Sequence, residues 1–437
     1  MRRLIFLKVL VLIPFLLSSV LVASSFYKPV PLKSFTGKQA APWEFIEQHH
    51  DPSPGFTSQL FHPKLYHFYQ QTELAFGNTK PHSSYFLLYA APGWDEVTYP
   101  HPVLLIPGAN DDATRRFAFP LSPMHPDHQK FPGLMQYLSK KGFAVFSISF
   151  SHFHGDNIFQ GEQIANAIKR IRKLLGRDED PDFKVDLVTF SKGAMAARCY
   201  AENAFSFYDK KYTAKFFTPY QGNIRRIVFQ CAPLAGMDLP YRYYMYNMFL
   251  QQNKVPAPMG AEKILLYGKL QSAGINFIHS GYWTGQLQMI HDQKLIGVPD
   301  SPFSWTADNN QTMIALKYGG QTLFLKARGL EAARLAGGNL IEKLNELGLP
   351  EGIEFSVLAG THPITYDDTH PTWKIPVGGD PVYTNDGLLF LNSAHYVKGL
   401  TVRGAKLLQK MSLAENHIDL SRSKKAYKFV FEQLKTR

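Results

Sequence analysis

The residues around Ser191 have the pattern of a buried strand that runs directly into a serine and then into a helix. Val185–Phe190 is hydrophobic, Ser191 follows it, and small residues continue from Gly193. A serine on so tight a turn takes an unusual backbone conformation, so residues two positions before and after it must be small. Gly193 meets this need, whereas Thr189 stands where glycine is usual. The pattern predicts a serine nucleophile, with a helix N-terminus that favours developing negative charge. An ordinary strand-to-helix turn is the alternative.

Acyl transfer from an ester also needs two main-chain N–H groups aimed at the developing oxyanion. The residue after the nucleophile, Lys192, is expected to supply the first. The second should come from a loop after an earlier strand. Val103–Ile106 is a buried stretch that ends in Pro107-Gly108, and this turn is the candidate.

A serine becomes nucleophilic at neutral pH only when a base removes its proton and a carboxylate orients that base. In proteins with a nucleophile elbow the chain order is serine, acid, histidine. Asp386 and His417 follow Ser191 in this order. The sequence leaves competitors open, since Asp238 could supply the acid. Three other histidines could supply the base: His362, His370 and His395.

Four segments resemble those of α/β-hydrolase lipases, in particular bacterial triacylglycerol lipases and esterases. Some lipases of this fold carry Thr-Trp-Ser-Gln-Gly around the nucleophile, which makes Thr189 tolerable, and Pro107-Gly108 stands where they commonly carry His-Gly. Thr384-Asn-Asp-Gly-Leu-Leu389 and Glu415-Asn-His-Ile-Asp-Leu420 are similar to the segments that bear the acid and the histidine. The resemblance implies a triad of Ser191, Asp386 and His417, with the N–H groups of Ala109 and Lys192 as the oxyanion hole.

No cofactor is expected, and calcium is the metal that the resemblance leaves possible. Some of the similar lipases bind a structural calcium through an aspartate two residues after the histidine, a position that Asp419 occupies here. Asp367 or Asp368 would be a second carboxylate, but calcium prefers six to eight oxygen ligands. His152 and His154, with Asp156, are too few and too closely spaced to indicate zinc. We interpret them as structural or pocket-lining residues.

The candidate residues must be positioned by an alternation of strands and helices, which indicates a largely parallel sheet covered on both faces. We therefore predict an α/β-hydrolase fold with an inserted helical cap or lid. The expected strands are Ser84–Ala91, Pro102–Ile106, Phe143–Phe150, Val185–Phe190, Ile227–Cys231 and Ile353–Ala359, and the expected helices include Leu134–Lys140, a stretch from Ile164 to Leu175, Gly193–Glu202 and Ser421–Lys435.

The predicted organisation has five parts. Residues 1–25 form a signal peptide or membrane anchor and 26–80 an N-terminal extension packed on the main domain. Residues 81–235 and 351–437 form the two parts of the hydrolase core. Residues 236–350 form the cap, because this stretch has few strand signals and is too long for a structureless loop. Its helical stretches are Tyr241–Leu250 and Glu331–Leu347.

The N-terminus has the layout of a secretory signal: Arg2 and Arg3, an apolar run from Leu4 to Ala23, and small residues after it. An uncleaved anchor is the alternative, because about 20 apolar residues can span a bilayer. We expect a secreted or periplasmic protein, or one anchored outside the cytoplasm. Removing residues 1–25 leaves 44 basic and 35 acidic residues, a net charge of +9. This charge favours anionic surfaces such as lipid headgroups, but the basic residues are too dispersed to indicate nucleic-acid binding.

The expected function is hydrolysis of a carboxylic ester through an acyl-enzyme, as in a lipase or a medium-to-long-chain esterase. Tyr241–Leu250 and Phe277–Trp283 offer apolar surface for an acyl chain, or for packing of the cap on the body. A lipid acyltransferase would use the same triad, and a non-catalytic binding protein on the same scaffold is the third candidate. Cys199 and Cys231 are the two cysteines. They allow one disulfide or two free thiols, and oligomeric state is left open.

Overall fold

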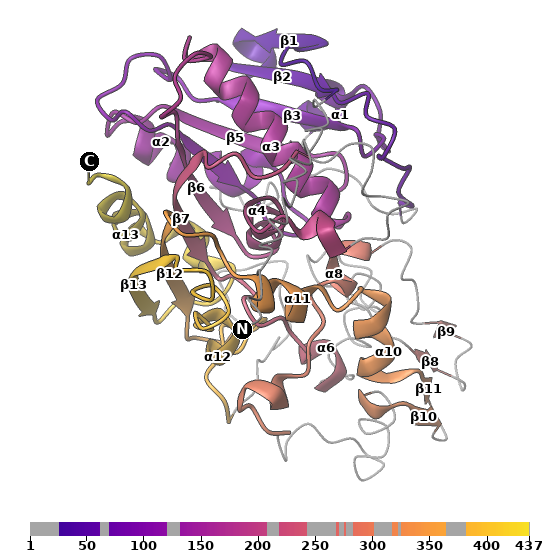
Figure 1. Cartoon of the computed structure of the whole chain (residues 1–437). Coiled ribbons are helices and arrows are strands. Elements are labelled where there is room, and N and C mark those ends of the chain that lie inside the picture. The colour runs from indigo at the N-terminus through magenta and orange to yellow at the C-terminus, as the bar shows by residue number, and fades with distance from the viewer. Residues whose placement is uncertain are drawn as a thin grey trace, which may run out of the picture.

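The computed structural model describes residues 26–61, 70–119, 132–207, 218–242, 268–270, 275–276, 283–300, 317–321, 325–363 and 382–436. A nine-stranded mixed sheet runs through the molecule in the order β1-β2-β3-β5-β4-β6-β7-β12-β13 (Figure 1). From β1 to β5 each neighbouring pair is antiparallel, and from β5 to β13 each pair is parallel. The bounds are β1 Lys33–Thr36, β2 Phe45–His50, β3 Tyr85–Ala90, β4 Val103–Ile106, β5 Val145–Phe150, β6 Val185–Phe190, β7 Ile224–Gln230, β12 Glu354–Gly360 and β13 Lys406–Leu413.

Helices cover both faces of this sheet, and each face has its own hydrophobic core. One core packs α3 (Asn157–Leu174), α4 (Gly193–Ala201) and α11 (Leu340–Leu347) on the sheet. The other packs α1 (Gln70–Phe76), α2 (Leu134–Ser139) and α13 (Lys424–Leu434) on the opposite face. Successive residues of a strand point to opposite faces, so Leu187 belongs to the first core and Val188 to the second. This explains why the central strands carry apolar residues on both faces.

The six strands predicted from the sequence are all present, within about three residues at each end. Three further strands of this sheet were not predicted. β1 and β2 lie in the N-terminal extension and add two antiparallel strands to the sheet. β13 is an edge strand whose residues are mostly exposed or half-buried, so it lacks the apolar run of its neighbours.

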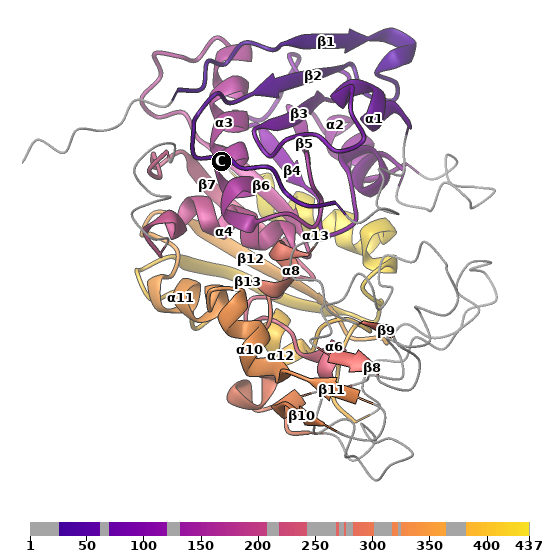
Figure 2. The ribbon, with the colours of Figure 1, turned by 90° about the vertical axis from the view of Figure 1, so that its right-hand side faces the viewer.

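The segment 236–350 contains a second sheet, of four short antiparallel strands in the order β10-β11-β8-β9, which the sequence pattern did not indicate. The predicted helical stretch Glu331–Leu347 is two helices, α10 (Gly329–Ala336) and α11, because Gly337 and Gly338 interrupt it. Figure 2 shows α10 and the small sheet at the end of the molecule opposite β1–β3. The bounds of the other elements are β8 Gly268–Leu270, β9 Ile275–Asn276, β10 Gly320–Gln321, β11 Leu325–Ala327, α6 Leu239–Arg242, α8 Thr284–Leu287 and α12 Leu391–Ala394.

A buried ion-pair cluster connects the start of this segment with a later part of the same segment. The Asp238 carboxylate accepts a hydrogen bond from Arg242 at 2.7 Å and lies 3.4 Å from the ammonium of Lys317. All three side chains are fully buried. Breaking a buried pair of this kind costs about 3–5 kcal/mol because one charge is left uncompensated. The cluster therefore holds the start of the segment against Lys317.

Several predictions from the sequence lie outside the described residues. They concern the N-terminal residues 1–25, most of the stretch Tyr241–Leu250, and the stretch 277–282. Among the described residues, no helix has the length and hydrophobicity needed to cross a bilayer. Cys199 and Cys231 are both buried free thiols, so the structure has no disulfide between them.

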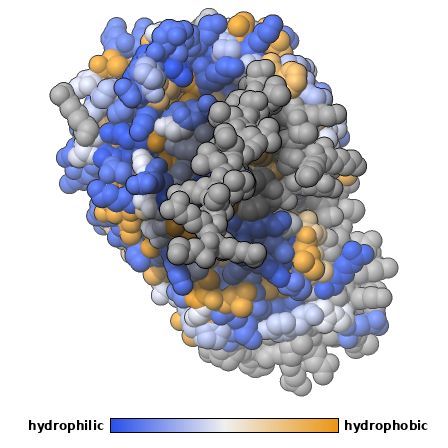
Figure 3. Space-filling view, in the orientation of Figure 1, coloured by the Kyte–Doolittle hydropathy of each residue, from blue (hydrophilic) through white to orange (hydrophobic). Residues whose placement is uncertain are grey.

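The described surface is largely polar on the face seen in Figure 3, where hydrophobic residues form small, separate groups. Isolated apolar residues on a protein surface are normal and need no functional explanation. The candidate residues meet instead at the carboxyl ends of the parallel strands.

Candidate active site

Ser191 occupies a strained turn between β6 and α4. Its φ is +50°, a left-handed conformation that residues with a side chain rarely adopt. The turn is tight, because a Cβ on Gly193 would lie 2.5 Å from the carbonyl oxygen of Pro107. The side chain of Thr189 is nevertheless accommodated, fully buried within β6. The geometry is that of a nucleophile elbow, as the sequence predicted.

The structure brings the three predicted side chains of the triad together. The imidazole Nε2 of His417 is 3.0 Å from the hydroxyl oxygen of Ser191, and its Nδ1 is 2.8 Å from Oδ2 of Asp386. Ser191 follows β6, His417 follows β13, and Asp386 lies against the end of β12. They meet because the carboxyl ends of parallel strands lie at one edge of a sheet.

Asp386 is a rigid acceptor, held from both sides of its carboxylate. Oδ1 accepts hydrogen bonds from the main-chain N–H groups of Leu388 (3.0 Å) and Leu389 (2.8 Å), which leaves Oδ2 for His417. A Cβ on Gly360, the last residue of β12, would lie 2.9 Å from the Cβ of Asp386. Glycine there lets the acid loop close on the strand end.

His417 is buried, and its ring is held from two directions. The main-chain N–H of His417 donates to the carbonyl oxygen of Asp386 at 2.8 Å. The Phe190 ring meets the imidazole edge to face, with 5.2 Å between ring centroids. Asn416 caps the following turn by accepting hydrogen bonds from the N–H groups of Ile418 and Asp419. The imidazole is thus fixed in the orientation that links serine and carboxylate.

The two main-chain donors predicted for an oxyanion hole lie on either side of Ser191. Among the described residues, the N–H groups of Ala109 and Lys192 have no acceptor within the protein. The Lys192 side chain is buried and donates from its ammonium to Oε1 of Gln160 at 2.5 Å. Burial lowers the pKa of the Lys192 ammonium to about 7. The main-chain N–H groups of Ala109 and Lys192 take no part in these side-chain contacts and remain available to an oxygen atom bound beside Ser191.

Gly108 sets the distance between Ser191 and the loop after β4 that carries the Ala109 N–H. A Cβ at this position would lie 2.9 Å from the Cβ of Ser191 and 3.0 Å from the carbonyl oxygen of Phe190. Gly108→Ala must therefore push the loop and the Ala109 N–H away. We expect kcat on an ester to fall by about 10²–10³, the effect of losing one oxyanion donor.

Gly176→Ala is the matched control, because that glycine has open space and a φ of +63°. This variant should lower the melting temperature through backbone strain and leave kcat within about twofold. Equal kcat values for wild type and Gly108→Ala would show that the loop does not serve the reaction.

The competing acid and bases are placed elsewhere. Asp238 is committed to Arg242 and Lys317. His395 Nε2 contacts the carbonyl oxygen of Met411 at 3.2 Å and the exposed hydroxyl of Ser412 at 3.4 Å, so it does not serve Ser191. In the described contacts His362 meets only the main chain at position 415, and His370 lies outside the described residues.

His152 and His154, interpreted from the sequence as structural or pocket-lining residues, contact other protein groups. His152 Nε2 lies 3.0 Å from the carbonyl oxygen of Leu60, and burial lowers the pKa of its imidazole to about 4. The His154 ring contacts Trp283 edge to face, with centroids 4.6 Å apart. Asp156 caps α3 through a hydrogen bond from the N–H at position 158. Among the described residues, the group of side chains with metal-ligand spacing does not include His152, His154 or Asp156.

The calcium candidate Asp419 does not fit a metal. One of its carboxylate oxygens pairs with the guanidinium of Arg422, and the other accepts a hydrogen bond from the Asn416 amide at 2.5 Å. A cationic side chain thus occupies the place a cation would take. Asp367 and Asp368 lie outside the described residues.

One neighbour of the triad has no signal in the sequence. The thiol of Cys231, which follows β7, lies with the carboxylate of Asp386 and the imidazole of His417 in a buried group whose polar atoms are all within 4.8 Å. Burial raises the pKa of this thiol well above its ordinary value. Cys231 therefore stays neutral and adds no second negative charge beside Asp386.

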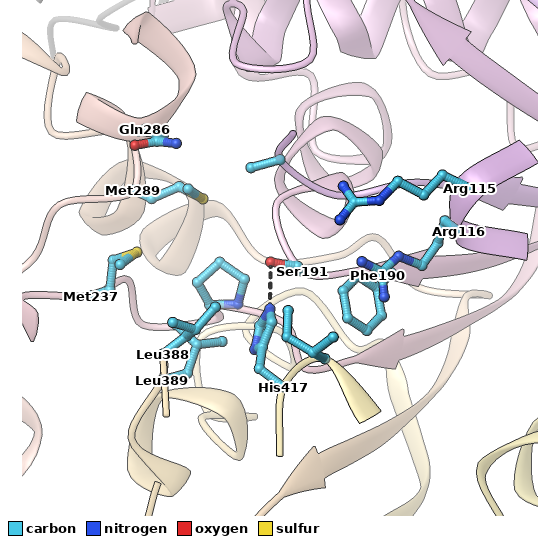
Figure 4. Close-up of a pocket in the computed structure, with 13 residues that line it drawn as sticks. Arg115, Arg116, Phe190, Ser191, Met237, Gln286, Met289, Leu388, Leu389 and His417 are labelled. Atoms are coloured by element: carbon cyan, nitrogen blue, oxygen red, sulfur yellow. Dashed lines mark hydrogen bonds between the residues drawn. The ribbon is translucent and has the colours of Figure 1, made fainter. Parts of the chain in front are cut away.

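A pocket opens beside Ser191 and His417 (Figure 4). Arg115 and Arg116 reach into it from one side, and Met237, Gln286 and Met289 face them from the other. The sequence analysis missed these residues, because nothing in their local pattern shows that they face Ser191. Further apolar lining comes from Phe190, Pro233, Leu388, Leu389 and Ile418.

The sheet order, the elbow and the sequence order of serine, acid and histidine define an α/β-hydrolase fold. No protein-family model and no curated protein matches this chain. Among solved structures, the chain is similar to a lipase of Bacillus licheniformis in its mature form (15% identity, 80% of this chain and 98% of that one, TM-score 0.36).

It is also similar to a thermostable carboxyl esterase of Bacillus coagulans (12% identity, 80% and 93%, TM-score 0.37) and to the thioesterase domain of the curacin biosynthetic pathway (13% identity, 80% and 95%, TM-score 0.30). At this level of similarity the likeness carries no conclusion about substrate or mechanism.

Proposed function

We propose that this protein is a serine hydrolase of carboxylic esters. The observation that carries the proposal is the continuous hydrogen-bonded chain from Ser191 through His417 to Asp386, at 3.0 and 2.8 Å. Histidine in this arrangement removes the serine proton during attack, and the carboxylate stabilises the imidazolium that forms. An ordinary packing histidine needs neither contact.

The reaction proceeds in two halves. The Ser191 oxygen bonds to the ester carbonyl carbon while its proton passes to Nε2 of His417, and the N–H groups of Ala109 and Lys192 hold the oxyanion. Collapse breaks the bond to the alcohol, which takes the proton from His417 and leaves an acyl-serine. In the second half His417 takes a proton from water, the hydroxide bonds to the acyl carbon, and the acid leaves as the serine is reprotonated.

The lining of the pocket supports an aliphatic acyl group as part of the substrate. Met237, Met289, Leu388, Leu389 and Ile418 present hydrocarbon and thioether surface next to Ser191. Each CH₂ buried there contributes about 0.8 kcal/mol. We therefore propose a lipase or a medium-to-long-chain esterase, whose acyl chain lies along this apolar wall.

Hydrolysis of a series of p-nitrophenyl esters from acetate to palmitate tests the proposal. We expect kcat/KM to rise with chain length over the first few carbons and to reach about 10⁴ M⁻¹s⁻¹ or more on the best ester. A chain-length profile that falls from acetate onward would contradict the acyl assignment. Absence of turnover on every ester would contradict the function. Product analysis with added alcohol separates hydrolysis from acyl transfer.

A further inference from the structure

Two arginines in the wall of the pocket are not explained by ester hydrolysis. Arg115 and Arg116 belong to the π-helical turn Thr114–Ala118, which follows the oxyanion loop. Single-turn π-helices are rare and are frequently found at functional sites. Both side chains line the pocket with Ser191 and point into it in Figure 4. A purely aliphatic substrate would gain nothing from them.

Arg116 is buried with one donor group unused. It is 7% exposed, and the Arg116 guanidinium carbon lies 3.9 Å from the centroid of the Phe190 ring. Its Nε and Nη2 pair with Oδ2 of Asp111. Its Nη1 has no hydrogen-bond partner in the protein. A buried donor without an acceptor is unfavourable, and an acceptor supplied by a ligand would remove that cost.

Arg115 adds a second guanidinium at the same wall. Its Nη1 donates to the carbonyl oxygen of Asn110 at 2.7 Å and lies 3.6 Å from Oδ1 of Asp111. Asp111 is thus the carboxylate that the two guanidinium groups share. Asp112 lies behind them, bonded to the Arg115 main-chain N–H, and burial raises its pKa to about 6. The acids do not line the pocket, whereas both arginines do.

We propose that Arg115 and Arg116 form a subsite for an oxyanion group of the substrate, so that the preferred ester carries a carboxylate or phosphate near the scissile bond. This inference rests on the proposed ester hydrolysis and narrows its substrate class. Guanidinium groups match the planar geometry of such anions and form charge-assisted hydrogen bonds with them. The apolar wall opposite, with Met237 and Met289, holds the aliphatic part of the same molecule.

Two substrate pairs test the subsite, each matched in length and differing in one anionic group. The first compares monoethyl adipate with ethyl hexanoate, which places a carboxylate on the acyl side. The second compares monohexanoylglycerol phosphate with monohexanoylglycerol, which places a phosphate on the alcohol side. We expect wild type to favour the anionic member of at least one pair by about tenfold or more in kcat/KM. The pair that shows the preference identifies the side that carries the anion.

Variants connect that preference to the arginines. In Arg116→Gln and in Arg115→Gln the ratio of anionic to neutral kcat/KM should fall toward one, and high salt should reduce it in wild type. Arg177→Gln is the control, because Arg177 pairs with Asp180 at the surface and should leave the ratio unchanged. Thermal melting checks the folding of Arg116→Gln, and Arg115→Gln supplies the test if that variant does not fold.

Three results would overturn the proposal. Wild type that cleaves both neutral esters without preferring either anionic partner would contradict the subsite while leaving ester hydrolysis intact. Arginine variants that lose activity equally on anionic and neutral esters would show that these residues support the loop or the oxyanion hole and do not bind an anionic group of the substrate. Wild type that cleaves none of the four esters would overturn the subsite and the hydrolase function together.

Discussion

Replacement of Ser191 by alanine is expected to lower kcat on any ester substrate by at least about three orders of magnitude, with a much smaller change in KM. Triad residues act as one unit, so removal of the nucleophile eliminates the acyl-enzyme path and leaves only the weak effect of the oxyanion donors. Alanine keeps the Cβ at the strained φ of +50°. The fold should therefore persist, as circular dichroism melting can show.

Ser412 offers a matched control for this substitution. Its exposed hydroxyl also lies near an imidazole, 3.4 Å from Nε2 of His395. His395 bonds to a main-chain carbonyl rather than to a carboxylate, so this second Ser–His pair has no orienting acid among its described contacts. Ser412→Ala should keep wild-type kcat within about twofold. Near-normal turnover in Ser191→Ala would show that Ser191 is not the nucleophile.

The second large effect is expected from Asp386→Asn, with kcat lower by about 10³–10⁴. The asparagine oxygen can still accept the N–H groups of Leu388 and Leu389, so the loop should keep its shape. The amide no longer offers a charge to Nδ1 of His417, so the imidazolium formed during attack is not stabilised. Measuring kcat and the melting temperature of the same variant separates this loss of activity from unfolding.

Asp419→Asn is the control for the acid. Asp419 lies two residues after His417, and its carboxylate pairs with Arg422 away from the triad. We expect kcat to change by no more than about threefold, because a partly exposed pair of this type contributes little. A large effect at position 419 together with a small effect at position 386 would reverse the assignment of the acid.

Much of the fold could be predicted because the central strands are buried on both faces. Val103–Ile106 is apolar at every position and Val185–Phe190 is mostly apolar, and both strands are buried along their whole length, which gives a strong signal. β13 is exposed at its edge and alternates weakly, so it was missed. The four-stranded sheet of the segment 236–350 was missed because its strands are only two or three residues long.

The prediction of the candidate site depended on order as much as on composition. An Asp-Gly turn and one histidine among 16 carry little information separately. Together with Ser191 they occur in the order that the fold requires. Asp238 and His395 were left open as competitors, and their three-dimensional contacts place them away from Ser191.

The pocket wall could not be predicted from the sequence. Arg115 and Arg116 are adjacent basic residues, which usually indicates a solvated surface. Their burial follows from the π-helical turn and from Asp111, which compensates their charge inside the protein. The contact of Cys231 with Asp386 and His417 could not be predicted either, because it arises from strands that are neighbours in the sheet and distant in the chain.

Fluorophosphonate labelling with peptide mapping by mass spectrometry tests the central claim most directly. The reagent reacts with a serine hydroxyl only where a base and an oxyanion hole activate it. We expect one label per chain, on Ser191, and strong suppression of labelling in Asp386→Asn. A folded protein that hydrolyses esters while Ser191 stays unlabelled, or that carries the label on another serine, would contradict it.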